Sequence, residues 1–140
     1  MFQVIDTNTL ASRLATIEQC KKVIDRTKEK GLAHYLKDQD TRLLTERALH
    51  LAIEASFDIA NHIIASKGYR RPASYSDIFV ILREEQVISE NLSERLVNMA
   101  RFRHRLVHLY TTLDNEIVFS ILENEFSDIL EFAALVSKML

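Results

Sequence analysis

The sequence predicts an all-α protein: a mostly antiparallel bundle of about five helices that forms one domain over residues 1–140. Three observations lead to this prediction. Glycine occurs twice and proline once in 140 residues, whereas sheet proteins need such turn residues at frequent intervals. Apolar residues recur at steps of three and four along most of the chain. The length and the hydrophobic content of 47% suit a single core.

The first two helices are predicted on either side of Gly31. "DTNT" supplies capping residues for the first helix, and Gly31 is suited to ending it. A second helix is expected from near Asp40 to Ser66 or Lys67, with Gly68 just past its end. The apolar positions of the two helices are Leu10, Leu14, Ile17 and Ile24 in the first, and Leu44, Ala48, Leu51 and Ala55 in the second.

Three further helices are predicted in the second half of the chain. "KGYRRPASY" is the clearest loop, since it holds one glycine and the only proline. Ser74 followed by Asp77 resembles a capping box that opens a short helix. Ser89 is placed to cap a fourth helix. After a break at "TTLDN", a last apolar helix is expected from Ile117 to Leu140.

Charge and cysteine content limit the possible partners and location. The formal charge is −2, which argues against binding nucleic acid by bulk electrostatics but allows a local basic patch. The single cysteine, Cys20, forms no internal disulfide, which is typical of a reducing compartment. The sequence shows no signal peptide and no apolar stretch long enough to span a bilayer. We therefore expect a cytoplasmic protein without a membrane anchor.

An arginine interrupts the apolar stripe of the fourth helix. The stripe advances in steps of 4, 3, 4, 3 and 4 through Leu92, Leu96, Met99, Arg103, Leu106 and Tyr110. An unpaired buried charge is costly, so Arg103 should be paired or face a cleft. Asp58, which interrupts the stripe of the second helix, is the first candidate partner, and Glu54 is the other. A purely structural ion pair or an arginine that reaches out to solvent remains an open alternative.

His108 and Tyr110 add chemistry to the same segment. His108 lies roughly 7.5 Å along the helix axis from Arg103 and about 140° around it, so the two side chains can reach a shared groove only at a helix edge. Tyr110 returns to the side of Arg103. A fixed cation, a group that titrates near neutral pH and a phenol within two turns suit phosphodiester chemistry.

These residues carry a resemblance to a known family. "FRHRLVHLY" resembles the R-x4-H-x-Y signature of the HEPN superfamily, specifically of the HepT toxin family of prokaryotic toxin–antitoxin systems. "ERALHLAIEASFDIANHIIA" and "PASYSDIFVIL" resemble the second helix of that family and the segment after it. The resemblance extends from about residue 40 to the end. It implies a homodimer whose two motifs meet in one groove, and a ribonuclease that needs neither metal nor cofactor. It also implies a nucleotidyltransferase antitoxin that transfers AMP to the motif tyrosine.

The resemblance assigns a role to each motif residue. Arg103 would hold the scissile phosphate, His108 would be the acid–base residue, and Tyr110 would accept AMP. His104 departs from the pattern, because the family usually has asparagine there; a histidine can still donate a hydrogen bond. The chemistry is consistent with these roles, since histidine transfers protons at neutral pH and an arginine fork stabilises phosphorane charge. One catalytic histidine per chain favours a dimer that brings two together.

Other interpretations of the basic residues remain. His104 and His108 have a metal-ligand spacing, although no third ligand is evident and we predict no metal site. Arg101 and Arg105 share a face with these histidines, which is either a solvated surface or a floor for an RNA backbone. A second set in the loop can extend such a floor: Arg70 and Arg71, with Tyr69 stacking on a base.

A different class of function is also compatible with the sequence. Some HEPN domains act as binding modules that partner nucleotidyltransferases without cleaving RNA. The presence of Arg103, His108 and Tyr110 together favours the ribonuclease, because a docking module does not need the arginine and the histidine.

Overall fold

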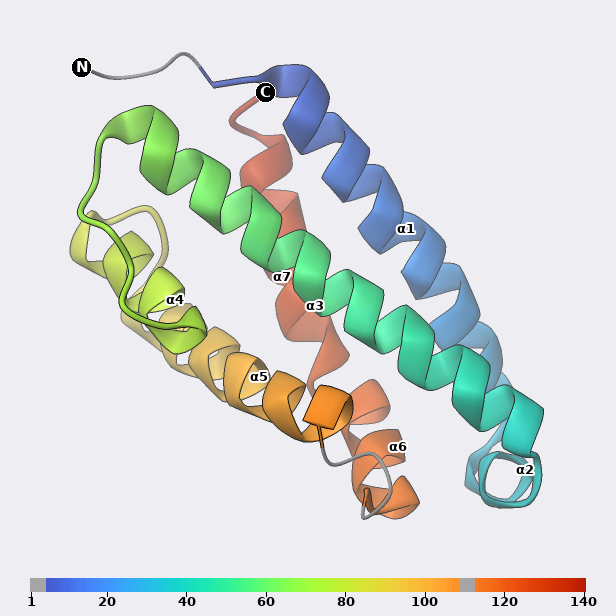
Figure 1. Cartoon of the computed structure of the whole chain (residues 1–140). Helices are drawn as coiled ribbons and strands as arrows, with labels where there is room; N and C mark the ends of the chain where they lie inside the picture. The colour runs from blue at the N-terminus through green and yellow to red at the C-terminus, as the bar shows by residue number, and fades with distance from the viewer. Residues whose placement is uncertain (1–4, 109–112) are drawn as a thin grey trace.

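The computed structural model of the protein describes residues 5–108 and 113–140, which form seven α-helices and no strand (Figure 1). The all-α class predicted from the sequence is confirmed. The helix count exceeds five because a short helix follows Gly31 and because the last predicted helix is broken in two. The helices are α1 (Thr7–Lys30), α2 (Leu32–Lys37), α3 (Gln39–Lys67), α4 (Tyr75–Glu84), α5 (Glu90–His108), α6 (Asn115–Asn124) and α7 (Phe126–Ser137).

Helix α3 is the centre of the bundle. It lies antiparallel to α1, while α4 and α5 pack along another side and α7 lies behind it (Figure 1). Leu49, Ile53 and Ile63 of α3 are fully buried, which explains why this 29-residue helix forms the core. Leu44 and Leu51 were predicted to be core residues, but they are 57% and 36% exposed. The buried stripe is therefore rotated away from the predicted one in the first half of α3.

Local chemistry sets the ends of α1 and creates α2. The Asp6 carboxylate accepts hydrogen bonds from the backbone N–H groups of Asn8 and Thr9, at 3.0 and 3.2 Å, and so caps α1. Gly31 ends the helix with a φ of +87°, in the region that favours glycine. Helix α2 follows at once, and Tyr35 anchors it because its side chain is fully buried. Six residues are too few to show a helical period.

The break between α6 and α7 occurs at Glu125, where φ is −124° and ψ is −19°. Leu122 before the break and Phe126 after it are both buried, so the apolar stripe continues across the change of direction. Neither glycine nor proline marks the site. Asp114 starts α6 by accepting hydrogen bonds from the N–H groups of Glu116 and Ile117.

The α1–α3 contact encloses the only cysteine of the chain. Cys20 is 5% exposed, and burial raises the pKa of its thiol. Together with Ala48 of α3 it lines a small cavity of about 190 Å³. None of the helices in the described ranges is both long and apolar enough to cross a membrane.

Candidate active site

Arg103 lies on α5 with its side chain 17% exposed. Its Nε donates a hydrogen bond to Oε1 of Glu54 on α3, at 2.6 Å. Its Cζ lies 4.5 Å from the centroid of the Tyr75 ring, at the start of α4. Two helices other than its own therefore orient the guanidinium. Arg103 was expected to be paired or to face a cleft, and it is paired, as the alternative of a structural ion pair also predicts.

The partner of Arg103 is Glu54, and the first candidate, Asp58, was wrong. Asp58 accepts a hydrogen bond from Nε of Arg13 on α1, at 2.9 Å, and both side chains are about half exposed. Four residues turn a helix by about 400°, so Asp58 lies about 6 Å along α3 from Glu54 and is rotated about 40° from it. This rotation directs Glu54 toward α5 and Asp58 toward α1.

His50 is a neighbour of the site that the sequence did not reveal. Its Nε2 lies 3.4 Å from Oε1 of Glu54, one turn along α3. The same carboxylate oxygen therefore faces both His50 and Arg103. The four-residue spacing of His50 and Glu54 was visible in the sequence, but it gains meaning only once Glu54 is known to bind Arg103.

His104 and His108 lie together on the exposed side of α5. Their ring centroids are 4.7 Å apart with an interplanar angle of 41°, and both residues are exposed at the end of the helix. The structure thus pairs the two histidines with each other and pairs Arg103 with α3 and α4. Tyr110, predicted as the modified residue, lies outside the described residues.

Arg101 and Arg105 form a basic rim beside the histidines. Both are exposed, and they line a surface cavity of about 410 Å³ between α5 and α6 with Asn98, Ile117 and Ser120. The histidines do not line this cavity. The spacing of the four residues on a regular helix places them on one side of α5, as predicted.

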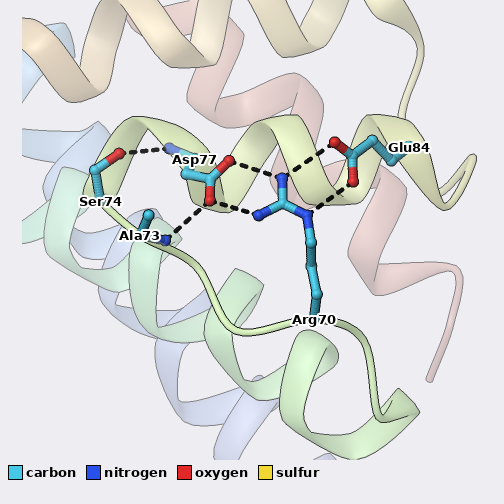
Figure 2. Close-up of polar contacts among 5 residues, drawn as sticks. All are labelled: Arg70, Ala73, Ser74, Asp77 and Glu84. Atoms are coloured by element: carbon cyan, nitrogen blue, oxygen red, sulfur yellow. Dashed lines mark hydrogen bonds and ion pairs between the residues drawn. The ribbon is translucent and has the colours of Figure 1, made fainter.

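Arg70, by contrast, holds the start of α4 in place (Figure 2). Its guanidinium bonds both oxygens of Asp77, at 2.7 and 2.8 Å, and both oxygens of Glu84, at 3.0 and 3.1 Å. Asp77 also accepts from the Ala73 N–H at 2.9 Å, and its own N–H donates to Oγ of Ser74 at 3.1 Å. The predicted cap at Ser74 is confirmed, but the returning bond of the capping box goes to the N–H of Ala73 and not to that of Ser74. The bond from Arg70 lowers the pKa of Asp77 to about 2.

This arrangement gives little support to an RNA contact in the loop. The guanidinium of Arg70 already faces two carboxylates. Tyr69 is partly buried against the core, so its ring is not an open stacking surface. Arg71 is exposed. RNA binding by Arg70 and Arg71 stays a prediction that the geometry does not favour.

No group of three or more histidine, cysteine, aspartate or glutamate side chains suited to holding a metal ion occurs within residues 5–108 and 113–140.

The all-helical bundle, the fixed arginine and the histidine pair near the end of one helix define a protein of the HEPN type. The chain belongs to the family described as "Ribonuclease HepT-like", whose model matches residues 16–136. It is 31% identical over 126 residues to the mRNA nuclease HepT of Shewanella oneidensis, covering 88% of this chain and 92% of that protein. It is 27% identical over 110 residues to the tRNA nuclease HepT of Aphanizomenon flos-aquae, covering 79% and 75%.

Solved structures of toxin–antitoxin complexes share the fold. One is the tri-AMPylated HEPN toxin of Shewanella oneidensis in complex with its MNT antitoxin, with a TM-score of 0.86 and 28% identity over 93% of this chain and 97% of that one. Another is a toxin–antitoxin complex with AMP-PNP, with a TM-score of 0.87 and 27% identity over 94% and 98%.

Proposed function

We propose that this chain is the ribonuclease toxin of a toxin–antitoxin pair, that it cleaves RNA without a metal ion, and that AMP transfer to Tyr110 neutralises it. The observation that carries the proposal is the fixed arginine: Arg103 is bonded to Glu54 and covered by Tyr75, on the helix that ends in exposed His108. Membership of the HepT-like family and the nuclease names of two relatives support the same class of activity.

The proposed reaction assigns one step to each group. His108 removes the proton from a 2′-OH, the resulting oxygen attacks the adjacent phosphorus, and Arg103 stabilises the charge on the phosphorane. The bond from phosphorus to the 5′-oxygen breaks, and the leaving oxygen takes a proton from the histidine of the second protomer. The products are a 2′,3′-cyclic phosphate and a 5′-hydroxyl. A homodimer with a shared groove is part of this proposal.

The RNA strand would follow the basic rim of α5. Arg101 and Arg105 are four residues apart on one face, and they line the cavity between α5 and α6. Lysine or arginine contacts of this kind bind phosphates independently of sequence. We propose that these two arginines bind the backbone, that His104 supports the site by donating a hydrogen bond, and that the protein acts in the cytoplasm.

The antitoxin partner is proposed by analogy with the solved complexes. The toxin of Shewanella oneidensis is tri-AMPylated and bound to an MNT antitoxin. In this chain Tyr110 is the matching acceptor, two residues after His108. An AMP phosphate there would place negative charge close to the groove and repel the RNA backbone.

The test is cleavage of a labelled single-stranded RNA in EDTA, with the product ends analysed for 2′,3′-cyclic phosphate. We expect cleavage by the parent chain, a loss of roughly 10²-fold or more in His108→Ala and in Arg103→Ala, and a smaller loss in His104→Ala. A requirement for Mg²⁺, or full activity of His108→Ala, would overturn the mechanism. Absence of cleavage together with tight binding to a nucleotidyltransferase would favour the non-catalytic HEPN binding module.

A further inference from the structure

Tyr75 lies between the hydrophobic core and Arg103. Its ring stacks on that of Phe57 of α3, with centroids 4.9 Å apart and an interplanar angle of 22°. The guanidinium carbon of Arg103 on α5 lies over the same ring, 4.5 Å from its centroid. The three side chains form one stack from three helices.

The base of this stack is rigid. Phe57 is 2% exposed and also contacts the ring of Phe79 at 5.9 Å, so the core fixes it. The backbone of Tyr75 is fixed as well, because it follows Ser74, which caps α4, and precedes Asp77, which Arg70 holds. Tyr75 itself is 49% exposed. An aromatic side chain that is half exposed yet held by the core presents a fixed surface to the guanidinium that lies over it.

We propose that Tyr75 is a positioning residue that sets the plane of the Arg103 guanidinium for phosphate binding. Glu54 fixes the guanidinium at Nε, and Tyr75 fixes its plane through a cation–π contact. With both constraints, the Nη atoms keep one direction, and they are the part of the fork that we assign to phosphate. This inference rests on the proposed function, because it gives Tyr75 a part in the binding site of that reaction.

The first test observes Arg103 directly and does not depend on catalysis. The Arg103 Nε–H signal in a nitrogen–proton NMR spectrum is assigned from its loss in Arg103→Lys. The bond to Glu54 moves this proton downfield, while the ring of Tyr75 shields it, so the signal should lie at the same position in the parent chain and in Tyr75→Phe, which keeps the ring. In Tyr75→Leu the bond to Glu54 stays and the ring shielding is lost, so the signal should move further downfield. An unchanged signal in Tyr75→Leu would overturn the proposal.

The second test measures cleavage. Tyr75→Leu should lower kcat/KM by between about twofold and thirtyfold, the range that a cation–π contact supports. Tyr75→Phe should restore the parent rate. Tyr75→Phe is thus the matched control, because it keeps the ring that contacts Arg103. Equal losses in Tyr75→Leu and Tyr75→Phe would overturn the positioning role.

The two tests separate failure of this inference from failure of the proposed function. If the NMR signal moves as expected but the parent chain cleaves no RNA, Tyr75 orients Arg103 and the ribonuclease assignment is wrong. If the parent chain cleaves RNA and the signal does not move, the ribonuclease assignment stands and the role of Tyr75 is wrong.

Discussion

Glu54 is the residue of α3 that binds and orients Arg103 at the candidate site. Its Oε1 accepts from Nε of Arg103 at 2.6 Å and lies 3.4 Å from Nε2 of His50. The side chain of Glu54 is 32% exposed, and that of Arg103 is 17% exposed. Hydrogen bonds between charged groups at such partly buried positions are stronger than those in open solvent. Substituting this carboxylate should therefore affect Arg103 more than any surface charge does.

We expect Glu54→Gln to lower RNA cleavage by about tenfold or more, since it removes a charge-assisted bond while keeping the shape of the side chain. Asp58→Asn is the matched control, because Asp58 pairs with Arg13 and both groups are exposed. It should stay within about twofold of the parent. The measurement is the steady-state rate of RNA cleavage by the parent, Glu54→Gln and Asp58→Asn. Equal effects of the two substitutions would contradict the assignment of Glu54 as the partner of Arg103.

The sequence predicted some site residues well because their signal is local. Arg103 stands out as the one charge on a regular apolar stripe, and the structure pairs it as expected. The choice between Glu54 and Asp58 depends on how α3 is rotated against α5, and that rotation is set by packing of the whole bundle. Tyr75 was invisible for the same reason, since its contact with Arg103 joins residues far apart in the chain.

At the scale of elements, helix starts that carry a capping side chain were predictable. The break between α6 and α7, which has no capping or turn residue, was not. Ser74 and Ser89 cap α4 and α5 as predicted, with Oγ accepting at 3.1 Å in each case. The break at Glu125 has no such signal, because buried Leu122 and Phe126 continue the apolar stripe across it. Periodicity reports which face of a helix is buried, and a bend that keeps the face buried leaves the pattern unchanged.

Helix α4 depends on Arg70 for its position, which predicts a pH-dependent effect. Arg70→Ala should lower the melting temperature by a few degrees at neutral pH, whereas Arg71→Ala, at the neighbouring exposed position, should not. The lowered pKa of Asp77 means that the bond stabilises the fold above the unfolded value of about 3.9. This stabilisation is lost as the pH falls through about 2.

The difference between the parent and Arg70→Ala should therefore shrink between about pH 4 and pH 2. Thermal melts at several pH values, followed by circular dichroism, measure it. A difference that persists unchanged at pH 2 would mean that the carboxylates are not what Arg70 stabilises.

For the whole molecule, we predict a homodimer in solution. The proposed mechanism needs two histidines in one groove, and α3 carries leucines that the bundle leaves uncovered: Leu43, Leu44 and Leu51 are 58%, 57% and 36% exposed. Sedimentation at micromolar concentration should give a species of about twice the chain mass of 16.2 kDa. A species of 16.2 kDa would remove the basis for the two-histidine reaction.

We also predict that the antitoxin neutralises cleavage by transferring AMP to Tyr110. Tyr110→Phe removes the acceptor oxygen and little else, so we expect it to keep much of the cleavage activity and to escape neutralisation. Intact-mass measurement after incubation with the cognate nucleotidyltransferase and ATP should find AMP on the parent chain only. AMP on Tyr110→Phe at the parent level would show that the switch lies elsewhere.

Because Cys20 is buried between α1 and α3, the rate at which its thiol is alkylated can report the separation of these two helices. The thiol is 5% exposed, its pKa is raised by burial, and no other cysteine competes with it. The reactive species is the thiolate, so we expect alkylation to be much faster when α1 separates from α3 than in the closed bundle. The rate of labelling should therefore rise with the frequency of this separation, without any engineered probe. A ligand or partner that binds only the closed bundle should slow the labelling in proportion to its occupancy.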